Sequence, residues 1–460
     1  MNEKQKGKFG NWIRTSITAR MLMVTFLMLI LLIPLGFIKE LIKERTERQE
    51  TVIDEINNKW GNEVLLYGPI LQIPYKVYIE KIITDKQTKT VQTETIEKIK
   101  YAYFFPRNLD IKGTINPEEK KRGIYKTAVY KSNLQINGSF NKPDFSDLDI
   151  DENQIIWEKT KIIINTSNLK GVNSRVQIMV NKHAYFFTSN YMGNSSINEF
   201  RNQKIIKLHS LESNHLKSVD IPIEKEINFE MKMDVNGSEQ ISFIPIGKET
   251  NINLSSNWKT ANFIGYFLPH NSDKINNNGF DAKWKVLDIN RPFSQQFFNT
   301  LPDLSNFASG VNFMIPVDEY QKSERSVKYG FLVIALTFLV FFLIQTLSKI
   351  QIHPFQYLMI GIALTMFYTL LISISEHSDF LKAYIISAIS VIVLITLYSK
   401  TILNQFKFSI FIGFSLFAMY AFIFVIIQLE NYALIVGSIG LFIILALVMY
   451  ISRKIDWINE

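Results

Sequence analysis

Long apolar runs mark both ends of this chain. Six runs carry almost no charge, and they cover 21–38, 329–347, 355–375, 381–398, 408–429 and 432–451. A helix needs about 20 apolar residues to cross the hydrocarbon core of a bilayer. The pattern therefore predicts six transmembrane helices, the last five of which form a bundle over 329–451. Lys382 lies in the first turn of the fourth helix, where its side chain can reach the headgroups.

The first apolar run, 21–38, predicts an uncleaved signal anchor. It follows a basic stretch and is longer than the apolar centre of a cleaved signal peptide. It ends in Leu-Gly-Phe-Ile, without a small-residue cleavage site, and Pro34 is expected to kink its outer end. Residues 39–60 then repeat apolar side chains at three- and four-residue spacing, which predicts a stalk helix. The stalk either packs on its own domain, the simpler interpretation, or pairs with a second copy to form an oligomer.

After the stalk, the spacing of apolar residues changes from the three to four residues of a helix to the two residues of a strand. Apolar and polar residues alternate in the runs 134–140, 176–180, 227–235 and 311–317. Strict alternation indicates a sheet with one buried face. Asparagine–glycine signals at 137–138, 236–238 and 277–279 are expected to be turns. Residues 61–328 are therefore predicted to form a large, mainly β domain, either one β-sandwich or two packed ones.

The charges give the orientation of the predicted spans. The net charge is +8, but residues 39–328 hold 39 basic and 36 acidic groups. Loops 376–379 and 430–431 carry no lysine or arginine, whereas the alternate loops and the tail carry Lys349, Lys400, Lys407, Arg453 and Lys454. The positive-inside rule then places the N-terminus (1–20) and the tail (452–460) in the cytoplasm and 39–328 outside it. The basicity is a signal of topology and does not predict a nucleic-acid partner.

Composition and motifs exclude several classes of chemistry. The chain has no cysteine, which excludes disulfides, thiolate catalysis and cysteine-bound clusters. Its histidines lack helical metal-ligand spacing, and we find no phosphate loop, zinc-protease motif or nucleophile elbow, so neither a cofactor nor an enzyme is predicted. The spans lack the interior ionisable residues that ion-coupled transporters need. Four small residues are expected instead to let helices pack closely: Gly361, Gly413, Gly437 and Gly440.

Several motifs resemble those of the CreD family of bacterial inner-membrane proteins. They include Gly68-Pro69-Ile70, Ser256-Asn257-Trp258, Tyr320-Gln321 with Arg325, His353-Pro354 and Ser375-Glu376-His377. The resemblance implies an inner-membrane protein with a periplasmic domain over 39–328. It also implies a link to cell-envelope integrity, colicin tolerance and control by a two-component system. The family has no established enzyme activity, so the resemblance supplies no catalytic residues.

Seven residues are candidates for a functional site or interface. Gly68 and Pro69 are expected to shape an edge or corner of the sheet, or to line a groove. His353 and Pro354 open a span, with a cytoplasmic ligand site as the alternative. Glu376 and His377 lie in a polar turn that could dock on the β domain, with a metal, proton or catalytic site as alternatives. Arg325 is the seventh, as a candidate interface residue.

Three hypotheses for the function follow. The leading one is a non-enzymatic envelope-integrity protein, held in the lipid bilayer, whose β domain binds an envelope protein, a lipid or a cell-wall component. The second is transport or handling of a lipid or another apolar envelope molecule, which needs no ionisable residue in the spans. The third is a hydrolase at the membrane surface, built around Glu376 and His377.

Overall fold

The computed structural model describes residues 17–84, 91–148, 150–190, 208–221, 226–313, 315, 319–348, 350–429 and 432–453. The start of the basic N-terminus, Lys349, the loop 430–431 and the tail from Lys454 lie outside the described residues. The chain divides into two compact units. The helical unit comprises Met1–Glu50 and Val317–Glu460, and the β-rich unit comprises Thr51–Pro316.

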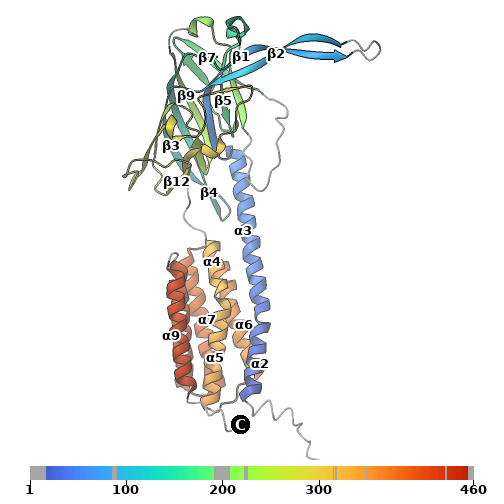
Figure 1. The fold of residues 1–460 in the computed structure, drawn as a ribbon. Coiled ribbons are helices and arrows are strands. Elements are labelled where there is room, and N and C mark those ends of the chain that lie inside the picture. The colour runs from blue at the N-terminus through green and yellow to red at the C-terminus, as the bar shows by residue number, and fades with distance from the viewer. Residues whose placement is uncertain are drawn as a thin grey trace, which may run out of the picture. The chain divides into compact units, whose positions relative to one another are not determined.

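The described helices match the predicted spans. They are α2 (Ile17–Ile30), α3 (Leu32–Trp60), α4 (Glu319–Lys328), α5 (Gly330–Ser348), α6 (Pro354–Ser375), α7 (Phe380–Leu403), α8 (Phe406–Gln428) and α9 (Ala433–Ser452) (Figure 1). They provide six stretches that are long and apolar enough to cross a membrane. The six predicted transmembrane helices are therefore confirmed.

One short helix was not predicted. The alternation pattern assigned residues up to 328 to the β domain, but 319–328 form α4 in the helical unit. The helix buries Tyr320, Ser323 and Val327, which recur at three- and four-residue spacing. Its other positions are polar, so the apolar face was too narrow to stand out in the sequence.

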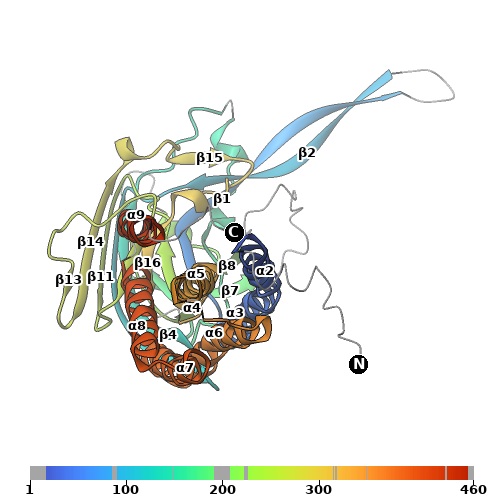
Figure 2. The ribbon, with the colours of Figure 1, turned by 90° about the horizontal axis from the view of Figure 1, so that it is seen from below.

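The helical unit is organised around α5. This helix contacts α2, α4, α6 and α8, and Figure 2 shows it inside an arc of α2, α6, α7 and α8. Its buried Phe338 and Phe341 form the core with Tyr357 and Leu364 of α6. Helix α9 contacts α8 and has no buried residue, which suits a helix that faces lipid on most sides.

Small residues set close helix contacts at three of the four predicted positions, Gly361, Gly413 and Gly440. At Gly437 a Cβ atom would meet only Cδ1 of Ile426, at an ordinary 3.8 Å. A Cβ atom at Gly361 would lie 2.0 Å from Cδ1 of Leu31. A Cβ atom at Gly440 would lie 2.1 Å from the ring of Phe422. The first helix is interrupted at Leu31, three residues before Pro34, whose missing N–H cannot bond to the preceding turn. The kink expected at Pro34 stays a prediction.

The strands of the β-rich unit form one curled sheet. They are β1 (Val64–Thr84), β2 (Val91–Phe104), β3 (Asn108–Arg122), β4 (Tyr125–Phe140), β5 (Lys161–Thr166), β6 (Gln177–Val180), β7 (His183–Asn190), β8 (His209–Ser213), β9 (Ile227–Ser238), β10 (Gln240–Phe243), β11 (Glu249–Ser256), β12 (Ala261–Gly265), β13 (Ile275–Asn276), β14 (Gly279–Leu287), β15 (Gln296–Phe298) and β16 (Ser309–Phe313). The order of this 16-stranded sheet is β12-β16-β10-β1-β5-β8-β7-β6-β9-β4-β3-β11-β14-β13, with β2 between β1 and β15.

The sheet folds over and closes through side chains. Strand β7 pairs with β6 through its first half and with β8 through its second, so it carries the sheet from one layer to the other. The two ends of the path meet where the ring of Phe263 on β12 lies 5.7 Å from that of Phe280 and 5.8 Å from that of Trp284 on β14. The layers enclose one apolar core, which confirms the predicted β-sandwich-like domain.

Two of the three predicted turns are wrong. Asn137-Gly138 lies inside β4, and Asn236-Gly237-Ser238 ends β9. A Cβ atom at Gly138 would lie 2.6 Å from Cζ of Phe229, so this glycine serves close packing and does not make a turn. The third signal is confirmed, because residues 277–278 form the turn between β13 and β14.

The end of α3 packs on the β-rich unit. Glu55 forms an ion pair with Arg122 of β3, and the hydroxyl of Thr127 on β4 donates to Asn57 Oδ1 at 3.1 Å. Within this unit the last turns of the stalk helix thus contact the domain that follows them, in line with the simpler of the two interpretations above.

Candidate functional site

Glu376 joins three helices of the helical unit. It caps the C-terminus of α6, and its side chain is only 13% exposed. Its Oε1 lies 3.4 Å from Nε of Arg45 on α3 and accepts a hydrogen bond at 3.3 Å from the hydroxyl of Tyr320 on α4. Docking of this polar turn on the β domain was one possibility from the sequence, whereas the observed partners of Glu376 are on α3 and α4.

His377 does not share this junction. Its side chain is exposed, and its Nδ1 lies 3.4 Å from the carbonyl oxygen of Ser373. Among the described residues, no hydrogen bond or ion pair links His377 to Glu376. A general acid–base pair needs its members within hydrogen-bond reach, so the geometry gives the hydrolase hypothesis no support.

Removing the Glu376 side chain should loosen the helical unit. We expect Glu376→Ala to lower the free energy of unfolding by about 1–3 kcal/mol, because the contacts from Arg45 and Tyr320 to the carboxylate are both lost. Asp379→Ala is the matched control, since its ion pair with Lys382 joins side chains that are 76% and 70% exposed. Such exposed pairs contribute about 0–1 kcal/mol. Thermal unfolding in neutral detergent measures both, and equal losses would contradict the structural role of Glu376.

His353 and Pro354 build the start of α6. The imidazole Nδ1 of His353 accepts a hydrogen bond from the backbone N–H of Phe355 at 3.2 Å. The backbone N–H of His353 donates to Oε1 of Gln356 at 2.8 Å. Together they form a capping box, and Pro354 fills the first helical position, where no N–H is needed. These contacts account for the motif as a helix start.

Gly68 and Pro69 lie where β1 changes partners. Strand β1 pairs with β10 up to Leu66 and with β2 from Leu71, and its pairing with β5 shifts register between Tyr67 and Ile70. Pro69 has no N–H to offer a ladder, and it sits in this gap between two partners. Gly68 has φ of 148°, and a Cβ atom there would lie 3.0 Å from the carbonyl oxygen of Ile163. The pair therefore shapes a corner within the sheet.

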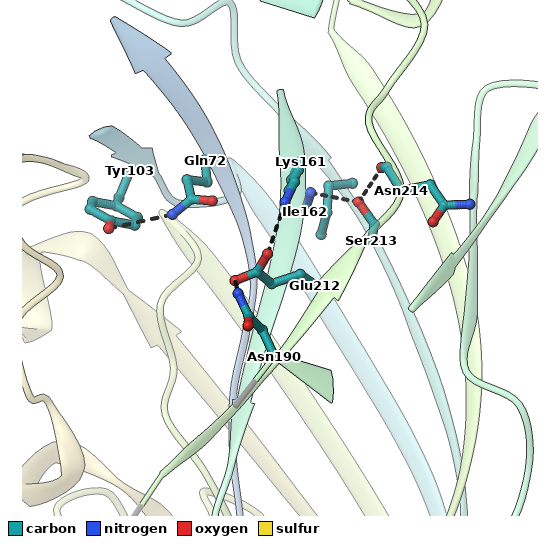
Figure 3. A network of polar contacts seen from close by, with 8 residues as sticks. All are labelled: Gln72, Tyr103, Lys161, Ile162, Asn190, Glu212, Ser213 and Asn214. Carbon is teal, nitrogen blue, oxygen red and sulfur yellow. Dashed lines mark hydrogen bonds and ion pairs between the residues drawn. The ribbon is translucent and has the colours of Figure 1, made fainter. Parts of the chain in front are cut away.

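Sequence reasoning missed a polar network on β5, β7 and β8. Figure 3 shows the carboxylate of Glu212 between Lys161 and Asn190. Lys161 Nζ and Asn190 Nδ2 each donate to it at 2.9 Å. Burial acts to raise the pKa of Glu212, but the hydrogen bonds from Asn190 and Lys161 outweigh it and lower this pKa below the usual value. Only strand pairing brings these residues together, so no sequence signal could have found them.

Glu212 should make stability depend on pH. A carboxyl group whose pKa is lowered by folding stabilises the folded protein at pH values above the pKa of the unfolded state. This contribution to stability is lost as the pH falls through the pKa of the folded state. We therefore expect the wild-type protein to lose stability below about pH 4.5. The Glu212→Gln variant should lose less stability over the same pH range, because it has no carboxyl group at this position to protonate. Unfolding measured between pH 7 and pH 3 tests this, with the exposed Glu158→Gln as control. Parallel pH profiles for wild type and Glu212→Gln would contradict it.

The hairpin of β1 and β2 continues past the rest of the sheet as an arm, defined here as residues 77–84 and 91–101 (Figure 2). The two strands pair as far as Thr84 and Val91, whereas β5 leaves β1 at Gln72 and β15 reaches only 102–104 of β2. Among the described residues, the outer edges of 77–84 and 91–100 thus pair with no other strand.

One face of the arm carries exposed apolar side chains. Tyr78 is 53% exposed, Ile99 47% and Tyr101 39%. They share a face, because Tyr78 lies opposite Glu97 in the ladder and Ile99 lies opposite Lys76. Lys76 Nζ forms an ion pair with Glu97 at 3.1 Å on the same face. The arm therefore presents an apolar surface with a paired charge at its centre.

Comparison with known proteins identifies the family. The family model described as "Inner membrane protein CreD" matches residues 16–458. The chain belongs to the CreD family. The protein described as "Inner membrane protein CreD" from Escherichia coli (strain K12) is 29% identical over 449 residues, which cover 93% of this chain and 91% of that protein. The six apolar helices agree with the inner-membrane location that the CreD descriptions state.

The family resemblance seen in the sequence is therefore confirmed, and several of its motif residues make contacts that shape the fold. In this CreD-family chain, Gly68-Pro69 forms a sheet corner, His353-Pro354 caps α6, and Glu376 joins three helices. Arg325 is half-buried in α4, which packs on α5, α6, α7 and α8. Neither CreD description names a reaction.

Proposed function

We propose that this CreD-family protein is a non-enzymatic, membrane-anchored binding protein that maintains the cell envelope. Its β-rich unit lies outside the cytoplasm and both termini lie inside. The orientation rests on the alternation of lysine- and arginine-bearing segments with segments that carry none. The binding role rests on the arm.

The arm favours a protein as the bound envelope component. An isolated two-stranded hairpin is marginally stable in water, so a long one gains from a third strand. Its free edges present backbone N–H and C=O groups that a strand of another polypeptide can pair with. Exposed tyrosines beside an apolar residue suit the centre of a protein interface. The partner is therefore an envelope protein that adds a strand to the arm and covers Tyr78, Ile99 and Tyr101.

The orientation can be tested directly, because the chain contains no cysteine. A cysteine in place of the exposed Val219 should react with a membrane-impermeant maleimide in intact spheroplasts. A cysteine in place of the exposed Gln405, between α7 and α8, should react only after the membrane is permeabilised. The reverse result would overturn the proposed orientation.

The envelope role is tested by deleting the gene. The deletion strain should become more sensitive to detergents and envelope-active antibiotics, and the wild-type protein should restore growth. Unchanged sensitivity and cell shape across these conditions would overturn the proposed role.

A further inference from the structure

The β-rich unit contains a cavity of about 790 Å³ whose lining includes no residue of the arm. Three aromatic rings and three cations are among its lining residues, and these are Phe104, Phe105, Phe293, Lys142, Lys248 and Arg291. The lining also includes the exposed Ile289, so the cavity reaches solvent. It thus combines an apolar wall with positive charge.

Arg291 is the unusual member of this lining. Arg291 is only 5% exposed, and its guanidinium lies 4.3 Å from the ring centre of Phe293. One terminal nitrogen donates to the Phe293 carbonyl oxygen at 3.2 Å, and the other donates to Oε1 of Gln295. Its Nε is buried without any hydrogen-bond partner. Both acceptors are neutral, so nothing bonded to Arg291 balances its charge.

No carboxylate among the described residues lies within ion-pair distance of Arg291. Asp288 is the acidic residue closest to Arg291 in the sequence. Its carboxylate faces Lys248 Nζ at 3.8 Å and accepts a hydrogen bond from the backbone N–H of Ile289 at 2.9 Å. Burial lowers the pKa of Arg291 to about 10, against the opposing effect of Asp288, which leaves the group charged at neutral pH. A buried charge without a counter-ion is unfavourable for folding alone. An anion that enters the cavity would remove this penalty.

We infer that the cavity binds a single oxyanion, a phosphate or a carboxylate, carried on an apolar or aromatic group. The oxyanion would lie beside the Arg291 guanidinium, whose charge it would balance, with Lys142 and Lys248 at its side. The apolar group would lie against Phe104, Phe105 and Phe293. Asp144 and Asp288 also line the cavity, so its cations exceed its acids by one and a polyanion is disfavoured. This inference stands apart from the proposed function of the arm.

The test uses the full-length protein in neutral detergent, with phenyl phosphate, inorganic phosphate and phenol as probes in calorimetric titrations. We expect phenyl phosphate to bind at least tenfold more tightly than inorganic phosphate, and phenol not to bind measurably. Equal affinity for phenyl phosphate and inorganic phosphate would contradict a role for the aromatic wall in binding. It would mean that the cavity binds the free anion. No binding of either phosphate would overturn the site altogether.

Variants assign the binding to the cavity. Arg291→Gln should weaken phenyl phosphate binding at least tenfold, and Lys142→Gln, at an exposed position, should weaken it several-fold. Arg175→Gln is the matched control, because Arg175 is an exposed arginine over a phenylalanine ring, 4.0 Å from the centre of Phe186. Without ligand, Arg291→Gln should unfold at the wild-type temperature or above it. Unchanged affinity in both cavity variants, or an equal loss in Arg175→Gln, would contradict the assignment.

Discussion

Replacing Trp284 with alanine is expected to lower the free energy of unfolding of the β-rich unit by about 3–5 kcal/mol, the usual range for a buried tryptophan. Trp284 is 2% exposed, and its ring meets that of Phe263 where the two ends of the sheet come together. Its indole N–H donates to the carbonyl oxygen of Phe267 at 3.1 Å. The substitution therefore removes both core volume and the contact that closes the sheet.

Two further variants separate these contributions. Trp284→Phe keeps an aromatic ring against Phe263 but leaves the Phe267 carbonyl without its donor, so we expect a smaller loss of about 1–3 kcal/mol. Trp60→Ala serves as control, because Trp60 is only half-buried at the end of α3. Chemical denaturation followed by circular dichroism measures all three. A loss at Trp284→Ala no larger than at Trp60→Ala would contradict the proposed closure.

Gly138→Ala is the second change for which we expect a large effect, about 3 kcal/mol of lost stability. A Cβ atom there would lie 2.1 Å from the carbonyl oxygen of Asn108 and 2.6 Å from Cζ of Phe229. The first neighbour is backbone of the paired strand β3, so the ladder itself has to move.

Gly123→Ala is the matched control for this steric effect. Gly123 has φ of 62° but nothing lies within 4 Å of its Cβ position. The Gly123→Ala variant should lose about 1–2 kcal/mol of stability, because alanine is strained in this backbone conformation. The same denaturation measurement compares the two variants, and a smaller loss at Gly138 than at Gly123 would contradict the close packing of β4.

The sequence predicted what depends on composition and period. Apolar length alone located the six spans, and alternation located long strands such as β9, because these signals need no knowledge of distant partners. The signal at Asn137-Gly138 misled because a glycine that permits a turn also permits close packing. Only the tertiary structure, through Phe229, distinguishes the two uses.

The contacts of the candidate residues were predictable only where the partners are close in the sequence. The helix start at His353-Pro354 was correctly interpreted, because its capping partners are local. The partners of Glu376 could not be inferred, because Arg45 on α3 and Tyr320 on α4 are both far from it in the sequence. Arg291 looks like any other basic residue in the sequence, since burial without a counter-ion is a property of the fold.

We propose that the arm binds a partner that the cell needs for envelope integrity. The most direct measurement is complementation of the deletion strain by a variant with Tyr78→Ser, Ile99→Ser and Tyr101→Ser, produced at wild-type membrane levels. A control variant replaces three exposed apolar residues outside the arm, Ile124, Val219 and Ile275, by serine. We expect the arm variant to fail to restore detergent resistance and the control variant to restore it. Full complementation by the arm variant would contradict a binding role for the arm.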